Sequence, residues 1–302
     1  MYYQSVANDI FEFTWDTENL VFDNLLCGMS ASGFDYSIWL TFIASIYFIG
    51  RYIACKKIFP DNTNVAFMVF LGAFITYSSA TNGFKAGAAT SLFVCAVAYK
   101  DTLRVAIPLL FLAVGMHHAM LVCVIAYIIT YFYRKQNFFC CIWLISVLLA
   151  IAHVTYFQSL LGNISPDEKA GSYLSLDSHL DSVSWRGGMR YDFVLYSAIP
   201  IIQSWWHRRQ YDLISDKYTF ILNLYMLLNS VWMLCMYANF TNRIAALSWA
   251  LYPIVIMLPY VEKNEGIEVY GTYGSNKAIS KVLLYNLLFT LFMGIIYYGL
   301  IK

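Results

Sequence analysis

Long apolar runs recur along this chain from Tyr36 to the last residue, and they limit the folds that it can adopt. Such runs are typical of membrane-crossing helices, because about 20 helical residues cross a hydrocarbon core of about 30 Å. The runs do not alternate between polar and apolar residues, as the strands of a membrane β-barrel do. We therefore predict an all-α, polytopic integral membrane protein.

Composition supports the same class. Charged residues make up 12% of the chain and hydrophobic residues 60%, whereas soluble domains carry about 25% charged residues. The net charge of +1 gives no reason to expect a nucleic acid partner. The 7 cysteines form no C-x-x-C pair and lie mostly inside apolar runs, which favours small core residues over a disulfide framework or a metal site.

The apolar runs predict about ten transmembrane or re-entrant helices in one transmembrane domain, residues 1–302. Residues 1–35 are predicted to be an outer amino-terminal segment and residues 161–190 an outer loop. Three of the predicted helices, 84–100, 105–116 and 118–133, are too short for a full bilayer unless the membrane is thinned or they are re-entrant. The predicted helices are 36–54, 64–80, 84–100, 105–116, 118–133, 138–160, 191–206, 218–238, 243–261 and 282–301.

Basic residues set the expected orientation. When the ten helices alternate in direction, thirteen of the 19 basic residues fall on one side, which the positive-inside rule identifies as cytoplasmic. These residues follow every second helix along the chain: Arg51, Lys56, Lys57, Lys100, Arg104, Arg134, Lys135, Arg208, Arg209, Lys217, Lys263, Lys277 and Lys281.

Four other basic residues stand at the ends of helices on the opposite, outer side: Lys85, Arg186, Arg190 and Arg243. One interpretation is that each side chain reaches lipid phosphates, as residues at the ends of membrane helices do. The interpretation that we favour is a shared anionic ligand. A phosphate or pyrophosphate accepts two parallel hydrogen bonds from a guanidinium group and offsets the cost of holding a cation near the bilayer.

Two histidines and one amide accompany these cations on the outer side. His117 and His118 lie between two short apolar segments in FLAVGMHHAML, and Asn82 precedes Lys85 by three residues, on the same helical face. Imidazole titrates near neutral pH, so His117 suits a proton acceptor; the alternative is a packed core histidine. Adjacent histidines on a helix point in different directions, so we predict no metal site. His153 carries no pattern.

The order of these features resembles the EpsG/Wzy family of bacterial polysaccharide polymerases. It consists of a basic residue opening an Ala-rich helix, a short hairpin with His at its tip, G-x-R-x-D-F before an apolar run, and an Arg opening a late helix. The more specific stretches are MHHAM at 116–120 and GMRYDFVLYSAIP at 188–200. Members usually begin with a helix before a Tyr-rich outer segment. That helix is missing here, so we expect either an amino end outside the cell or a sequence that begins within a longer reading frame.

The resemblance implies glycosyl transfer from a polyprenyl-pyrophosphate-linked oligosaccharide at the outer face of the cytoplasmic membrane, with no cofactor and no nucleic acid. Membrane lipids and a chain-length regulator protein are the other implied partners. The implied catalytic residues are His117, Arg190, Asp192 and Arg243, and the implied substrate-binding residues are Lys85, Asn82, Arg186 and His118. Arg190 and Asp192 would not share a face of a continued helix, so no direct pair between them is expected.

Three other functions fit parts of the pattern. A transporter or flippase of lipid-linked sugars would also need outer cations, but it favours charges through the bilayer depth or two symmetrical halves with broken helices, and the sequence shows no internal repeat. A membrane-bound O-acyltransferase needs a cofactor path from the cytoplasmic face, which nothing in the sequence suggests. A purely structural subunit leaves the four outer cations without a reason.

Overall fold

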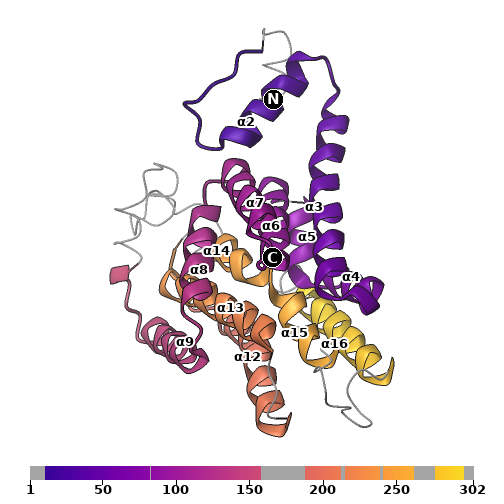
Figure 1. Ribbon diagram of the computed structural model, residues 1–302. Helices are drawn as coiled ribbons and strands as arrows, with labels where there is room; N and C mark the ends of the chain where they lie inside the picture. The colour runs from indigo at the N-terminus through magenta and orange to yellow at the C-terminus, as the bar shows by residue number, and fades with distance from the viewer. Residues whose placement is uncertain are drawn as a thin grey trace. The chain divides into compact units, whose positions relative to one another are not determined.

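The computed structural model describes residues 11–81, 83–157, 188–211, 215–238, 241–261 and 276–295 (Figure 1). Within these ranges every regular element is a helix, which confirms the predicted all-α class. The predicted ligands Asn82 and Arg186, and most of the predicted loop 161–190, lie outside the described residues. The chain divides into two compact units, Met1–Val124 with Gly271–Lys302, and Ile125–Tyr270, which are treated separately below.

Helices occupy each of the ten predicted apolar segments, with changed boundaries. They are α2 (Leu20–Ala31), α3 (Tyr36–Ile58), η1 (Pro60–Asn62), α4 (Thr63–Leu71), α5 (Phe74–Thr81), α6 (Phe84–Ala98), α7 (Leu103–Met116), α8 (Met120–Phe132), α9 (Gln136–Ile151), α12 (Tyr191–Tyr211), α13 (Asp216–Leu234), α14 (Thr241–Trp249), α15 (Tyr252–Val261) and α16 (Asn276–Ile295).

Helix length and apolarity identify fewer membrane spans than the sequence predicts. Tyr36–Ile58 and Thr241–Val261 are long and apolar enough to cross a membrane, and the pair Pro60–Leu71 and Phe74–Ala80, bent by 71°, forms a third candidate. The 15 residues of α6 measure about 22 Å at 1.5 Å per residue, which is less than the hydrocarbon thickness. The described helices therefore support a membrane protein without confirming ten crossings.

In the first unit, α3 and α6 approach closely because small residues line their contact. A Cβ atom added to Gly50 would lie 2.5 Å from Ser91 Oγ, so only glycine fits there. The Ser91 hydroxyl donates to Tyr47 O at 2.7 Å, and the Cys95 thiol donates to Gly50 O at 2.9 Å. Small residues and hydroxyl-to-carbonyl hydrogen bonds stabilise helix pairs where water is absent.

The predicted outer segment 1–35 contains a helix, α2, that the apolar pattern does not reveal. Asn24 anchors the preceding chain, since its side chain exchanges hydrogen bonds with the backbone of Thr14 at 2.9 and 2.8 Å. A Cβ atom on Gly115 of α7 would lie 2.4 Å from Val21 Cγ2, so α2 packs directly on α7. Phe22 is buried against Trp39 of α3, with ring centroids 5.2 Å apart.

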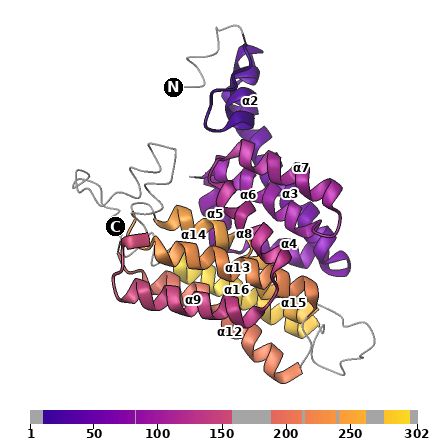
Figure 2. The same ribbon diagram turned by 60° about the vertical axis from the view of Figure 1, so that its left-hand side comes forward.

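In the second unit, α9, α13 and α14 lie side by side (Figure 2) and share a buried hydrogen-bond network. Asn229 of α13 is fully buried at its centre. Trp143 of α9 donates its indole N–H to Asn229 Oδ1 at 2.8 Å, and Asn229 Nδ2 donates to Ser248 Oγ of α14 at 3.0 Å. One amide therefore joins three helices.

Replacing Asn229 by leucine should destabilise this unit by about 1–3 kcal/mol, because it leaves the buried indole N–H of Trp143 without an acceptor and removes the hydrogen bond that Ser248 Oγ accepts. The measurement is the thermal unfolding midpoint of the purified protein in detergent. Double substitution of Trp143 by phenylalanine and Asn229 by leucine should recover part of the loss. Equal midpoints for wild type and Asn229→Leu would show that the network contributes nothing.

Candidate functional site

In the second unit, Arg190 and Asp192 form a two-point ion pair, which corrects the expectation that they would not meet. Arg190 Nε donates to Asp192 Oδ1 at 3.0 Å, and Nη2 donates to Oδ2 at 2.6 Å. The expectation failed because α12 begins only at Tyr191. Arg190 accepts the first helical hydrogen bond, from Val194 N, and precedes the helix, so its side chain can fold back over the first turn.

The Arg190 guanidinium also lies over an aromatic ring. Its Cζ is 3.8 Å from the centroid of the Phe193 ring. Phe193 is buried and packs edge-on against Trp249, with centroids 4.8 Å apart, and lies 6.4 Å from Trp232. A guanidinium held by a carboxylate along one edge and by an aromatic ring on one face has its plane fixed in advance.

The same aromatic cluster connects Arg190 with the helix that carries Arg243. Trp232 of α13 donates its indole N–H to Thr241 Oγ1 at 2.9 Å, and Thr241 is the first residue of α14. Arg243 follows two residues later and is exposed. The start of α12 and the start of α14 therefore lie at one end of the second unit, as the alternating topology requires for Arg190 and Arg243.

In the first unit, Lys85 and His118 both contact the start of α2, at Phe22 and at the preceding residue Asn19. Lys85 opens α6, and its Nζ lies 5.3 Å from the centroid of the Phe22 ring. Helix α7 ends at Met116, where His117 turns to extended backbone with φ of −153°. The His118 backbone N–H donates to Asn19 Oδ1 at 3.0 Å. Lys85, His117 and His118 are all half-buried.

Several residues predicted to face the cytoplasm gather at the other helix ends of each unit. In the first unit, Lys57 Nζ lies 5.2 Å from the Tyr99 ring, so the ends of α3 and α6 meet. In the second, Arg134 Nη1 bonds Asp216 Oδ2 at 3.1 Å, and Arg209 lies 5.0 Å from the Trp205 ring. Within each unit, these basic residues lie at the ends of helices opposite those that carry the predicted ligands.

Arg51 is an exception, and its predicted place after the first helix is wrong. It lies inside α3 and is only 3% exposed. Its Nη2 donates to Thr90 Oγ1 at 3.3 Å, and its Cζ is 5.2 Å from the Phe70 ring. The predicted helix 36–54 extends past Arg51, and the observed helix continues to Ile58, so the guanidinium packs inside the unit and does not lie beyond the helix end. The glycine just before Arg51 was the available signal of a close helix contact.

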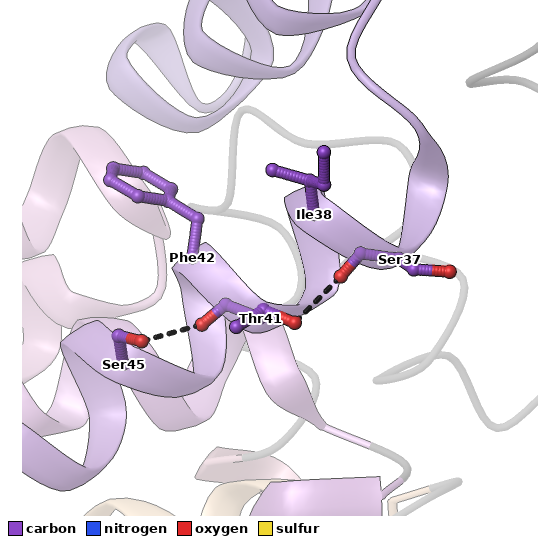
Figure 3. A pocket seen from close by; sticks show the side chains of 5 residues that line it. All are labelled: Ser37, Ile38, Thr41, Phe42 and Ser45. Atoms are coloured by element: carbon purple, nitrogen blue, oxygen red, sulfur yellow. Dashed lines mark hydrogen bonds between the residues drawn. The ribbon is translucent and has the colours of Figure 1, made fainter.

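A shallow hollow of about 340 Å³ lies along α3 and is lined by none of the predicted ligands (Figure 3). Ser37, Thr41 and Ser45 line it together with Ile38 and Phe42. Thr41 Oγ1 donates to Ser37 O and Ser45 Oγ to Thr41 O, both at 2.7 Å, so these hydroxyls satisfy the helix backbone first. Among the described residues no three His, Cys, Asp or Glu side chains are grouped as metal ligands.

The EpsG family model matches residues 1–301. No curated protein and no solved structure matches the chain. The EpsG family is a Wzy-like polysaccharide polymerase family, with glycosyltransferase-like polymerase activity in general. The apolar helices agree with a membrane protein of polysaccharide biosynthesis. With a match that covers the whole chain except its last residue, this protein belongs to the EpsG family.

Proposed function

We propose that this protein joins lipid-linked oligosaccharide repeat units into O-antigen, capsular polysaccharide or exopolysaccharide at the outer face of the cytoplasmic membrane. Family membership supports the polymerase activity. The observation that carries the finer proposal is the Arg190 guanidinium, which is oriented by Asp192 and Phe193 at the end of the unit where Arg243 is exposed.

In the proposed reaction the donor is a glycan linked to polyprenyl pyrophosphate. A hydroxyl of a second lipid-linked unit attacks the anomeric carbon, a new glycosidic C–O bond forms, and the bond from that carbon to the pyrophosphate oxygen breaks. The hydroxyl proton passes to a base, and the polyprenyl pyrophosphate leaves with its electron pair. Negative charge therefore grows on the leaving phosphate oxygens, and cations placed beforehand stabilise that charge most effectively.

Each residue of the second unit has a distinct proposed task. Arg190 and Arg243 bind the leaving pyrophosphate, because guanidinium stays charged and matches phosphate geometry. Asp192 is a positioning residue that holds the plane of Arg190 through its two hydrogen bonds. The roles of Lys85, His117 and His118 of the first unit, including His117 as the proton acceptor, stay predictions, as do those of Asn82 and Arg186.

The proposed partners are the polyprenyl-pyrophosphate-linked oligosaccharide, membrane lipids and a chain-length regulator protein. The proposal requires no nucleic acid and no cofactor.

Reconstitution tests the proposal against the flippase alternative. Liposomes that contain the full chain would receive the lipid-linked oligosaccharide extracted from the host's own membranes. We expect a ladder of glycans several repeat units long and release of polyprenyl pyrophosphate in proportion to the bonds formed. Movement of a fluorescent lipid-linked substrate across the bilayer with no ladder would support the flippase and contradict the polymerase.

A further inference from the structure

The carboxyl end of α9 has a backbone conformation that its residue does not favour. His153 has a φ of 57°, in the left-handed region, where a Cβ atom crowds the following carbonyl group. His153 N donates to Ala150 O at 3.1 Å, and Val154 N donates to Leu149 O at 3.0 Å. These two bonds form a Schellman motif, which usually has glycine at this position. A histidine is therefore held at a place where glycine would cost less.

A second aromatic ring holds the His153 imidazole in place. The ring of Tyr237 is stacked on it, with centroids 3.9 Å apart and 17° between the planes. The Tyr237 hydroxyl donates to Ala150 O at 2.9 Å, the same carbonyl that accepts the His153 N–H. Tyr237 is half-buried, whereas His153 is exposed. The result is an exposed imidazole backed by a fixed phenol ring.

This stacked pair lies at the same end of the second unit as the first turn of α12. Tyr237 follows the end of α13, and Trp232 near that end lies 6.4 Å from Phe193 in the first turn of α12. Within the second unit, the stacked rings and the Arg190–Asp192 pair therefore lie at one end.

We propose that His153 and Tyr237 form a stacking platform for one pyranose ring of the saccharide substrate, at the end of the second unit that carries Arg190 and Asp192. This inference rests on the proposed function, since it adds a sugar-binding subsite to the proposed pyrophosphate site. The C–H face of a pyranose carries partial positive charge and lies well on the negative face of an aromatic ring. The hydroxyl groups of the pyranose need hydrogen-bond donors and acceptors around the ring, and guanidinium and carboxylate groups are of this kind.

The arrangement differs from that of an ordinary aromatic belt. Belt residues are mostly single Trp and Tyr rings with their apolar faces toward lipid. Here a polar imidazole is stacked on a phenol and kept in a conformation that glycine would adopt at lower cost. Such a fixed ring loses little freedom when a ligand binds, so pre-organisation explains why the strained position is occupied by an aromatic residue.

The first test replaces His153 by glycine and by asparagine, both of which accept left-handed backbone. In the reconstituted polymerase we expect about a tenfold rise in the KM for lipid-linked substrate, the size of one lost aromatic contact, with kcat changed much less. The unfolding midpoint of His153→Gly should equal or exceed that of wild type. An unchanged KM in both variants would overturn the platform. A collapse of kcat at unchanged KM would overturn it too, because it would indicate proton transfer instead.

A second set of variants tests the supporting ring. Tyr237→Leu removes the stack and should raise KM about as much as His153→Gly. Tyr237→Phe keeps the ring and loses only the hydrogen bond to Ala150, so it should show the smaller rise. Tyr156→Leu is the matched control, since Tyr156 is another exposed ring near the end of α9, 67% exposed. Equal KM values for Tyr237→Leu and Tyr156→Leu would contradict the proposal.

A binding measurement separates this subsite from the polymerase activity itself. The probe is the oligosaccharide freed by mild acid from the host's lipid-linked precursor, detected on the full chain in detergent by saturation-transfer NMR. We expect transfer to one sugar ring of the probe, and loss of that transfer in His153→Gly. Transfer that persists unchanged in His153→Gly would refute the subsite even if polymerisation is real. Transfer that depends on His153 would support the subsite even if no polymer forms.

Discussion

Replacing Arg190 by alanine is expected to abolish long-chain glycan while material carrying a single repeat unit persists. The guanidinium is held by Asp192 and Phe193. In the proposed reaction it would therefore stabilise the leaving pyrophosphate without reorganisation. Loss of one such group lowers turnover by roughly 100- to 1,000-fold. Arg243→Ala should give the same phenotype. The measurement is the glycan length distribution on gels from cells that carry each variant at equal protein level.

Arg209→Ala is the matched control for this experiment. Arg209 lies on the same helix as the Arg190 site, and its guanidinium also contacts an aromatic ring, Trp205, but at the predicted cytoplasmic end. Cells that carry Arg209→Ala should therefore make glycan of full length. Arg190→Lys keeps the positive charge but loses the planar guanidinium with its paired hydrogen-bond donors, so this variant should retain only part of the polymerase activity. Full-length polymer in both Arg190→Ala and Arg243→Ala would count decisively against the proposed site.

Substituting leucine for Gly50 should prevent the first unit from folding stably. The added Cβ atom alone would lie 2.5 Å from Ser91 Oγ, and the further carbons would push α3 away from α6. The hydrogen bonds from Ser91 to Tyr47 O and from Cys95 to Gly50 O would then break. Overpacking of this kind costs about 3 kcal/mol, a large fraction of the stability of a typical domain.

The checks are the amount of protein recovered from membranes and the unfolding midpoint in detergent. Ala44→Leu is the control, because Ala44 lies exposed on the same helix. This substitution therefore introduces the same leucine side chain outside the packed face. Ala44→Leu should be recovered like wild type. If Gly50→Leu also accumulates and melts like wild type, α3 and α6 do not pack through Gly50.

Much of the helical arrangement follows from the sequence pattern. Each of the ten apolar runs contains helix, and Lys57 meets Tyr99 at one end of its unit, as alternating helices require. Apolar runs predict helices because backbone groups away from water must bond within the segment itself. The boundaries were less accurate: helix α9 of the 138–160 run ends at Ile151, and the 64–80 run is broken into α4 and α5.

The helix α2 shows what the pattern could not reveal. Its residues are partly polar, so no apolar run marks it, yet it packs on α7 through Val21 and on α3 through Phe22. The contact depends on the missing side chain at Gly115, almost a hundred residues away in the sequence. Tertiary packing therefore decides that the segment before the first apolar run lies against Lys85 and His118.

The sequence alone determined the class of this protein, its family resemblance and which helix ends carry the cations that we predict to face outward, because these depend on composition and on order along one chain. Only the tertiary structure decided that Arg190 binds Asp192, that Arg51 is buried, and that His153 stacks on Tyr237. Each of these contacts depends on the residue at which a helix starts or ends. Each also depends on which side chain, distant in the sequence, packs against the residue concerned. Neither property is encoded in the local pattern of apolar and charged residues.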